Sequence, residues 1–305
     1  MNCKFMSKKN AAIITVAIVL IGLTVCGSLW DYQMAKTLYW GQLPSENLFG
    51  VVFAFIGILP TFVGWAFLGA SILYLSRKQC QSKKKRGWLT VLSVLLFVLA
   101  FFYFCNTLFL VNESAFSVHW AIAYSVGVAV LAGAAFLGYW LSKHSDNPEL
   151  LKKVLFLTAV SLVTMVIIMS SKEIMDRPRF RWVMQMGKPE YFRNWWQSGS
   201  ELQASQSANV VSDEFSSFPS GHSAYAMFAI FLFPAFADYT AKCKKYRGLL
   251  FVGGCLWWGL TALSRLTVGA HYVTDVCIAG LVTIAAYAIV ALLFRRFQKE
   301  KDKFV

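Results

Sequence analysis

The chain has 305 residues, of which 57% are hydrophobic and only 14% are charged, and its mean hydropathy is +0.55. Soluble domains carry about 25% charged residues, so this composition excludes an ordinary soluble domain and indicates a polytopic membrane protein. The net charge of +14 does not favour nucleic-acid binding, because the basic residues lie in short runs between apolar segments.

Apolar segments recur along the whole chain, and each is about long enough to cross a bilayer as a helix. The first follows Lys4, Lys8 and Lys9 and resembles a signal peptide, but its length and the lack of a small-residue cleavage site favour an uncleaved span. We therefore predict an all-α membrane protein with about eight transmembrane helices. They are expected at 11–30, 47–75, 88–111, 119–141, 151–171, 221–237, 248–264 and 273–294.

The distribution of basic residues predicts the orientation of these spans. If the N-terminus is cytoplasmic, most of the 29 Lys and Arg residues lie in the segments expected inside, including 83–86, 242–247 and 295–303. This bias predicts an even number of spans with both termini in the cytoplasm. The segments 31–47 and 172–219 then lie on the extracytoplasmic face of a plasma-membrane protein.

The seven cysteines form no CxxC pair, and none lies in the long polar segment 172–219. We interpret them as small apolar fillers with reduced thiols.

A cluster of functional residues stands between the last two predicted spans, in the sequence SRLTVGAHYVTD (264–275). If His271 and Asp275 lie on a helix, they share a face, so Asp275 could accept a hydrogen bond from one ring nitrogen of His271. The other ring nitrogen would then be free to act as a nucleophile. Arg265 supplies a permanently charged, planar group that suits phosphate oxygens.

Further polar residues stand at both ends of the segment 172–219, on the same predicted face. Lys172 and Arg179 would add two cations for a phosphate group. Ser220 and Gly221 would offer a hydroxyl and backbone N–H groups at a helix N-terminus, where anions are favoured. His222 could serve as a general acid. Glu173 and Asp176 are expected to pair with nearby arginines, whereas the adjacent acids 213 and 214 are expected to be solvated.

Aromatic residues cluster in the middle of this long segment, at Tyr191, Phe192, Trp195 and Trp196. Such clusters usually anchor a protein at the headgroup level of the membrane. Lining an entrance for lipid is the alternative interpretation.

The three sequence groups, taken in order, resemble the motifs of the type 2 phosphatidic acid phosphatases, a family of membrane lipid phosphatases related to vanadium haloperoxidases. The motifs are a Lys separated from an Arg by six residues, the sequence Pro-Ser-Gly-His, and Ser-Arg followed by His and Asp. The resemblance covers about 86–305 and implies a six-helix phosphatase core. Residues 1–85 would form an additional N-terminal pair of helices.

The resemblance also implies roles for the motif residues. His271 would attack phosphorus, Asp275 would orient it, and His222 would protonate the leaving oxygen. The phosphate-binding residues would be Lys172, Arg179, Ser220, Gly221 and Arg265. Because these cations could neutralise the phosphate, we expect no metal or other cofactor.

The first motif departs from the family pattern at one position. The proline expected after its arginine is replaced by Phe180, whereas an Arg-Pro pair occurs at 177–178. Arg179 is preferred as the phosphate ligand because its spacing from Lys172 matches, with Arg177 as the alternative.

The expected function is hydrolysis of a lipid phosphate or pyrophosphate at the outer leaflet, with a phosphohistidine intermediate. Undecaprenyl pyrophosphate, phosphatidylglycerophosphate, phosphatidic acid and diacylglycerol pyrophosphate are candidate substrates by resemblance. The alternatives are a lipid phosphotransferase that uses the same site and a lipid-binding or transport protein without catalysis. Taken alone, each histidine could simply be an interfacial residue at the end of a span. The complete motifs favour the functional interpretation.

Overall fold

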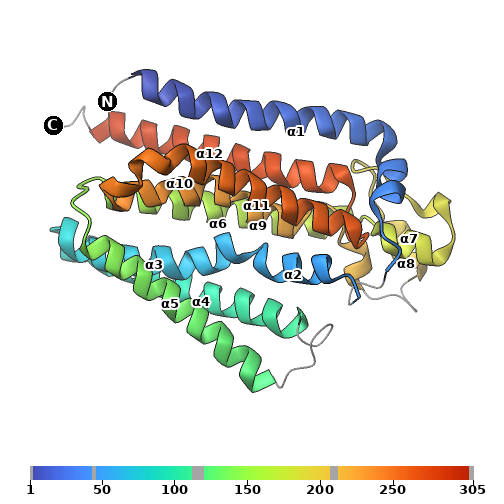
Figure 1. Cartoon of the computed structure of the whole chain (residues 1–305), viewed down its shortest axis with the longest axis horizontal. Helices are drawn as coiled ribbons and strands as arrows, with labels where there is room; N and C mark the ends of the chain where they lie inside the picture. The colour runs from blue at the N-terminus through green and yellow to red at the C-terminus, as the bar shows by residue number, and fades with distance from the viewer. Residues whose placement is uncertain (1–2, 43–45, 112–119, 207–211, 302–305) are drawn as a thin grey trace.

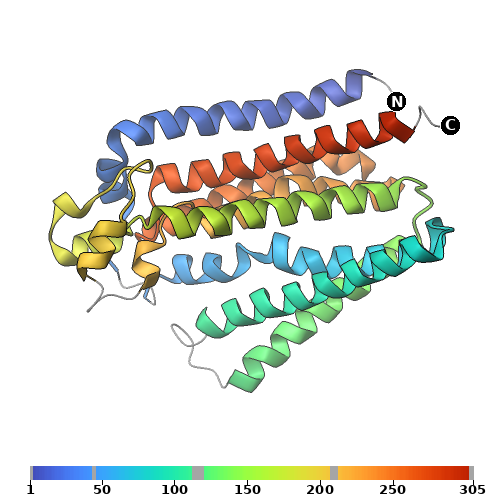
Figure 2. The same cartoon turned by 180° about the vertical axis from the view of Figure 1, so that it is seen from behind.

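A computed structural model describes residues 3–42, 46–111, 120–206 and 212–301. This part of the chain is helical and contains no β-strand, which confirms the predicted all-α class. Most of the long helices run along the longest axis of the molecule and form one bundle (Figure 1). The beginning of α1 and the end of α12 lie at one end of the bundle. The short helices α7 and α8 lie at the opposite end (Figures 1 and 2).

The helices follow the predicted segments closely in number and place. Seven segments are long and apolar enough to cross a membrane in the described part of the chain. The long helices are α1 (Cys3–Leu38), α2 (Leu48–Ile56), α3 (Leu59–Gln79), α4 (Lys83–Val111), α5 (Trp120–Lys143), α6 (Leu150–Met175), α10 (Ala229–Tyr239), α11 (Arg247–Thr267) and α12 (Val273–Lys301).

The predicted span at 221–237 is not a single helix long enough to cross the membrane. It consists of α9 (Gly221–Met227) followed by α10, and the two meet at Phe228. Pro234 lies inside α10 and cannot donate a backbone hydrogen bond to the preceding turn. The two pieces together run along the bundle beside its other helices (Figure 1).

The first helix extends further than predicted. The sequence placed its end at Trp30, but α1 continues to Leu38, and only Trp30 itself has non-helical dihedral angles (φ −132°, ψ 22°). Residues 31–38 are therefore helical rather than part of an interfacial loop. The charged Asp31 made this stretch look like a loop, although its side chain is buried.

Packing within the bundle joins the N-terminal helices to the remainder. Helix α1 packs along α12, and α3 packs against α4, α5 and α6. Helix α12 also contacts α6 and α9. Many apolar side chains on the outer surfaces remain exposed, such as Ile18 and Val98, as expected for a surface that faces lipid.

The segment between α6 and α9 folds into short helices that cover one end of the bundle. They are α7 (Phe180–Met186), the 3₁₀ helices Pro189–Tyr191 and Ser212–Phe215, and α8 (Ser200–Gln206). Trp182 packs on Tyr191 and Phe215 and forms a small core of its own. The chain thereby brings both ends of this long segment to the same end of the bundle.

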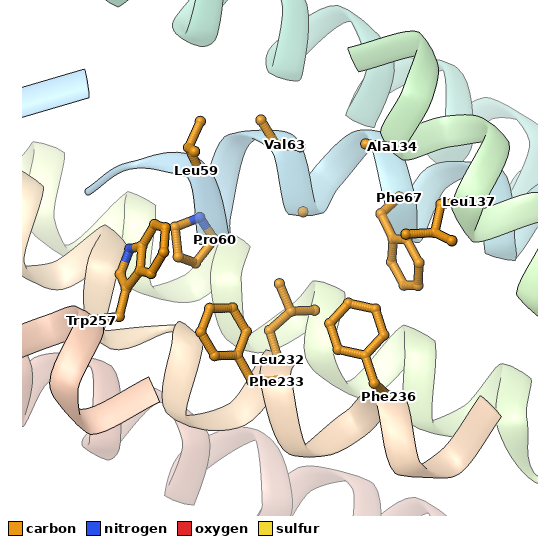
Figure 3. Close-up of a pocket in the computed structure, with 11 residues that line it drawn as sticks. Leu59, Pro60, Val63, Phe67, Ala134, Leu137, Leu232, Phe233, Phe236 and Trp257 are labelled. Carbon is orange, nitrogen blue, oxygen red and sulfur yellow. The ribbon is translucent and has the colours of Figure 1, made fainter. Parts of the chain in front are cut away.

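An apolar cavity of about 190 Å³ lies between α3, α5, α10 and α11 (Figure 3). Leu59, Phe67, Phe236 and Trp257 are among its lining residues. None of the predicted site residues lines it, so the candidate site is elsewhere.

Candidate active site

The eight predicted site residues come from five helix ends, which lie at the end of the bundle that carries α7 and α8 (Figures 1 and 2). They are Lys172 near the end of α6, Arg179 directly before α7, Ser220, Gly221 and His222 at the start of α9, Arg265 near the end of α11, and His271 and Asp275 on either side of the start of α12.

His271 is held by a backbone carbonyl rather than by Asp275. Its Nδ1 lies 2.6 Å from the carbonyl oxygen of Ser217, whereas the distance from Nδ1 to Oδ2 of Asp275 is 3.8 Å. The expected direct hydrogen bond between the two side chains is therefore wrong. The reason is local: α12 begins at Val273, so His271 precedes the helix, and helical spacing does not apply to it.

The turn before His271 depends on Gly269. This residue adopts φ +63°, a conformation that residues with a Cβ rarely take, and its carbonyl accepts a hydrogen bond from the backbone N–H of Arg181. The turn ends α11 and directs the chain into α12. His271 is buried in this turn, with 3% of its surface exposed.

Asp275 is fully buried and accepts three hydrogen bonds. The donors are Nη1 of Arg177 at 2.5 Å, the Ser217 hydroxyl at 2.6 Å and the backbone N–H of Tyr272 at 2.8 Å. Because Ser217 both donates to Asp275 and accepts from His271, it connects the two side chains. Asp275 is therefore linked to His271 through Ser217.

Electrostatics favour the neutral form of His271. Burial, followed by the positive charges of Arg179 and Lys172, holds the pKa of its imidazole well below the ordinary value of 6.5. A neutral imidazole has a lone pair on one nitrogen. The site thus contains an unprotonated imidazole among cationic side chains.

His222 stands in the first turn of α9 and is partly exposed. Burial holds the pKa of its imidazole well below the ordinary value of 6.5, and the neighbouring Arg265, His271, Lys172 and Arg179 lower it further. The structure therefore gathers the residues of all three motifs around one point.

Lys172 and Gly221 are close neighbours. A Cβ atom added to Gly221 would lie 3.6 Å from Cε of Lys172, and Nζ of Lys172 donates to the carbonyl of Ser216 at 2.8 Å. The hydroxyl of Ser220 lies 2.9 Å from that of Ser223 and accepts from the Ser223 backbone N–H, so it caps α9.

Arg265 is buried beside the N-terminal helices. Its Nη2 donates to the carbonyl of Gly50 in α2, and its Nε donates to the Ser264 hydroxyl at 3.2 Å. Helix α2 therefore contacts Arg265, a residue predicted to bind phosphate, although the sequence analysis placed α2 outside the six-helix core.

The two arginines of the first motif have different surroundings. Arg177 is completely buried and pairs with Asp31 at 2.9 Å and with Asp275. Arg179 is partly buried and pairs with the exposed Asp213 at 2.6 Å. Arg177 is thus already saturated by buried carboxylates, which leaves Arg179 as the arginine of this motif that a phosphate could reach.

The acidic residues of the long segment also pair differently from expectation. Asp213 is exposed, as expected, although it also pairs with Arg179. Glu214 is only partly exposed and pairs with Arg181 at 2.5 Å, so the expectation of a solvated side chain is wrong for Glu214. The chain folds the 3₁₀ helix Ser212–Phe215 back onto α7 and thereby brings these charges together.

Several residues of the site could not be assigned from their motifs. Asp31, Ser217 and Thr274 all contact the Arg177–Asp275 pair or Asp275 itself. Asp31 could have been suspected from the sequence, because an acid that follows a long apolar run needs a partner if the helix continues. The role of the Ser217 carbonyl could not, since every residue has a backbone carbonyl.

Six cysteines lie in regions where side chains are described, and all six are free, as predicted. In these same regions, no group of three or more His, Cys, Asp or Glu side chains could hold a metal ion. The absence of a cofactor requirement stays a prediction.

The fold and site define a class: an all-helical, polytopic membrane protein with histidines and cations gathered at one end of its bundle. Residues 150–301 match the family model of the PAP2 superfamily. The chain therefore belongs to this superfamily, as its three motifs indicated. The match begins at α6, so the predicted core boundary at residue 86 stays a prediction.

The chain is also similar to phosphatidylglycerophosphatase B of Haemophilus influenzae, with 35% identity over 89 residues. These residues are 29% of this chain and 35% of that protein, so the chain spans about a third of the length of the curated relative it matches. No solved structure matches the chain.

Proposed function

We propose that this protein is an integral membrane phosphatase that hydrolyses a lipid phosphate or pyrophosphate through a phosphohistidine intermediate. The observation that carries the proposal is the hydrogen bond from Nδ1 of His271 to the Ser217 carbonyl. A carbonyl oxygen can only accept, so Nδ1 bears the proton of the neutral ring. Nε2 then has the lone pair and is the nucleophile.

The neighbouring charges suit phosphoryl transfer. Lys172, Arg179 and Arg265 would neutralise the phosphate oxygens, with the backbone N–H of Gly221 and the hydroxyl of Ser220 as further donors. The backbone N–H of Ser220 is not available, because it donates to the Asp275 carbonyl at 3.2 Å. Asp275 would stabilise the positive charge that develops on His271. Its Oδ2 lies 3.8 Å from Nδ1, which is close enough for electrostatic attraction.

The proposed reaction has two steps. Nε2 of His271 bonds to phosphorus while the bond from phosphorus to the lipid oxygen breaks, and that oxygen takes a proton from protonated His222 and leaves with the lipid. The negative charge of the bound phosphate would favour this protonated form by offsetting the neighbouring cations. Neutral His222 then accepts a proton from a water molecule that attacks the phosphohistidine. Inorganic phosphate leaves, and both histidines return to their starting forms.

The substrate class follows from the position of the site and from the family. A site at the end of a transmembrane bundle favours amphipathic substrates over free sugar phosphates. The excess of basic residues near the termini supports placing the site at the outer leaflet of the plasma membrane, with both termini cytoplasmic. The similarity to a phosphatidylglycerophosphatase makes phosphatidylglycerophosphate the first substrate to test.

An assay of free phosphate tests the proposal. Purified protein is incubated with phosphatidylglycerophosphate, phosphatidic acid, diacylglycerol pyrophosphate and undecaprenyl pyrophosphate, with and without EDTA. Release from at least one lipid, unchanged by EDTA and lost in His271→Ala, is expected. No release from any lipid would refute the phosphatase, and loss with EDTA alone would refute the metal-independent mechanism.

The same site could transfer the phosphoryl group to another lipid or sugar. A second acceptor lipid added to the assay separates the two activities, because a transferase would yield a phosphorylated acceptor instead of free phosphate. Hydrolysis is preferred because the partly exposed His222 can be reached by water.

A further inference from the structure

Asp31 is the acidic side chain of α1, and it is buried in a helix that otherwise exposes much of its surface. Only 3% of Asp31 is exposed, whereas the apolar residues Ile18 and Leu29 of the same helix are exposed by 63% and 66%. Burying a charge is costly unless it is paired, and charges within membrane helices commonly serve function. The partners of Asp31 therefore indicate its role.

Those partners lead directly to the candidate site. Oδ2 of Asp31 accepts from Nη2 of Arg177 at 2.9 Å and from the hydroxyl of Thr274, and Oδ1 accepts from the Thr274 backbone N–H at 3.2 Å. Nη1 of Arg177 donates in turn to Thr274 Oγ1 at 2.9 Å and to Asp275 at 2.5 Å. A single guanidinium thus bridges two carboxylates, one on α1 and one on α12.

The charges of this group do not cancel. Two carboxylates and one guanidinium leave one net negative charge in a buried place, and Asp275 is the member that faces His271. If Asp31 were neutral, Arg177 would be paired with Asp275 alone. The field of Asp275 at His271 would then be largely compensated by that arginine.

We propose that Asp31 is a positioning residue for the phosphatase site, which keeps Arg177 and Thr274 in place and leaves Asp275 free to stabilise a positively charged His271. This inference rests on the proposed function and gives the N-terminal helix α1 a part in it. Because the positive charge on His271 appears only during transfer, Asp31 should affect kcat and leave KM nearly unchanged.

The test compares Asp31→Asn with Asp238→Asn. Asp238 pairs with Lys153 at 2.7 Å and Arg247 at 2.8 Å, and it lies in the last turn of α10, near the opposite end of the bundle. Both variants lose one carboxylate that is ion-paired with basic side chains. Their midpoints of thermal unfolding therefore measure how much each loss destabilises the fold. kcat is expressed per active site, counted from the burst of phosphoenzyme.

Asp31→Asn is expected to lower kcat about tenfold or more with KM within about twofold, the usual range for loss of a side chain that orients a functional residue. Asp238→Asn should keep the wild-type kcat. Thr274→Val should have a smaller effect, and the double variant Asp31→Asn/Thr274→Val should lose less than the product of the single losses, since both act on Arg177.

A kcat of Asp31→Asn equal to that of Asp238→Asn would overturn the proposal, as would a loss that falls entirely on KM. If the wild-type protein releases no phosphate from any lipid, the proposed function fails and the role of Asp31 fails with it. If the wild type is active and Asp31→Asn is unimpaired, only the role of Asp31 fails.

Discussion

At His271, one hydrogen bond decides which ring nitrogen carries the lone pair. Nδ1 donates to the Ser217 carbonyl, and Ser217 is itself fixed by its hydroxyl bond to Asp275. The orientation of the imidazole therefore depends on a backbone atom, which substitution of side chains does not remove. Asp275 contributes mainly its charge and its hold on Ser217.

Replacement of His271 should abolish the reaction. His271→Ala removes the proposed nucleophile, so kcat/KM for lipid phosphate hydrolysis should fall by at least about 10³-fold. The matched control is His144→Ala, because His144 is exposed and its ring lies against Trp140 in the last turn of α5. Comparable losses in both variants would show that His271 has no special role.

The pH dependence of activity should reflect the lowered pKa of His271. A lowered pKa keeps the ring neutral, and hence nucleophilic, as the pH falls through 6.5. kcat/KM, corrected for the separately measured ionisation of the lipid phosphate, should not fall until the pH is more acidic than this. An acid limb with its midpoint at or above about 6.5 would contradict the assignment.

At the scale of single residues, the motifs predicted which side chains lie at the same end of the bundle, and the roles of these side chains stay predictions. Spacing favoured Arg179 over Arg177, but the reason that Arg177 is occupied could not be seen that way, because it involves Asp31, 146 positions earlier in the chain. The direct bond between His271 and Asp275 was predicted wrongly, because the start of α12 two residues after His271 is not evident from hydropathy.

At the scale of elements, the contact between α1 and α12 is the one that joins the N-terminal helices to the site. Gly27 makes this contact possible, since a Cβ atom added there would lie 2.8 Å from the Thr274 methyl group. Asp31 follows one turn later on the same face of α1. Helix α1 therefore approaches Thr274 closely enough for Asp31 to reach Arg177.

Two glycines of α1 provide a matched pair of substitutions. Gly27→Ala should displace Thr274 and so lower both the thermal midpoint and kcat. Gly22→Ala should be neutral or stabilising by up to about 1 kcal/mol, because nothing lies within 4 Å of its added Cβ and alanine favours helix. Thermal unfolding in detergent and the phosphate assay measure both effects. Equal thermal midpoints and equal kcat values in the two variants would rule out the close contact between Gly27 and Thr274.

The interruptions of helices were the least predictable elements. The apolar segment 47–75 was expected as one span, but it contains the break between α2 and α3 before Pro60. The segment after Ser220 breaks at Phe228, not at Pro234. Hydropathy shows that such segments are apolar throughout, but it does not show where their backbone hydrogen bonds change partners.

At the scale of the whole molecule, the charge pattern and the arrangement of helices both indicate an even number of membrane crossings. The start of α1 and the end of α12 lie at the same end of the bundle, and the candidate site lies at the other (Figure 1). An even number of crossings was predicted from charge alone. Which side of the membrane each end faces stays a prediction.

Labelling of introduced cysteines tests that orientation. In a cysteine-free background, Gln197→Cys lies in the exposed segment near α8, and Ser82→Cys lies in the exposed turn before α4. A membrane-impermeant maleimide should label residue 197 in intact spheroplasts and residue 82 only after permeabilisation. The reverse pattern would place the site in the cytoplasm.

The most direct test of the account is detection of phosphate on His271 during turnover. The wild-type protein is mixed with a lipid phosphate that it hydrolyses, quenched in base within milliseconds, and digested for mass spectrometry. We predict an acid-labile, base-stable phosphoryl group on Nε2 of His271, absent from His271→Ala. Rapid phosphate release without any phosphorylated histidine, or with the phosphoryl group on another residue, would contradict the mechanism.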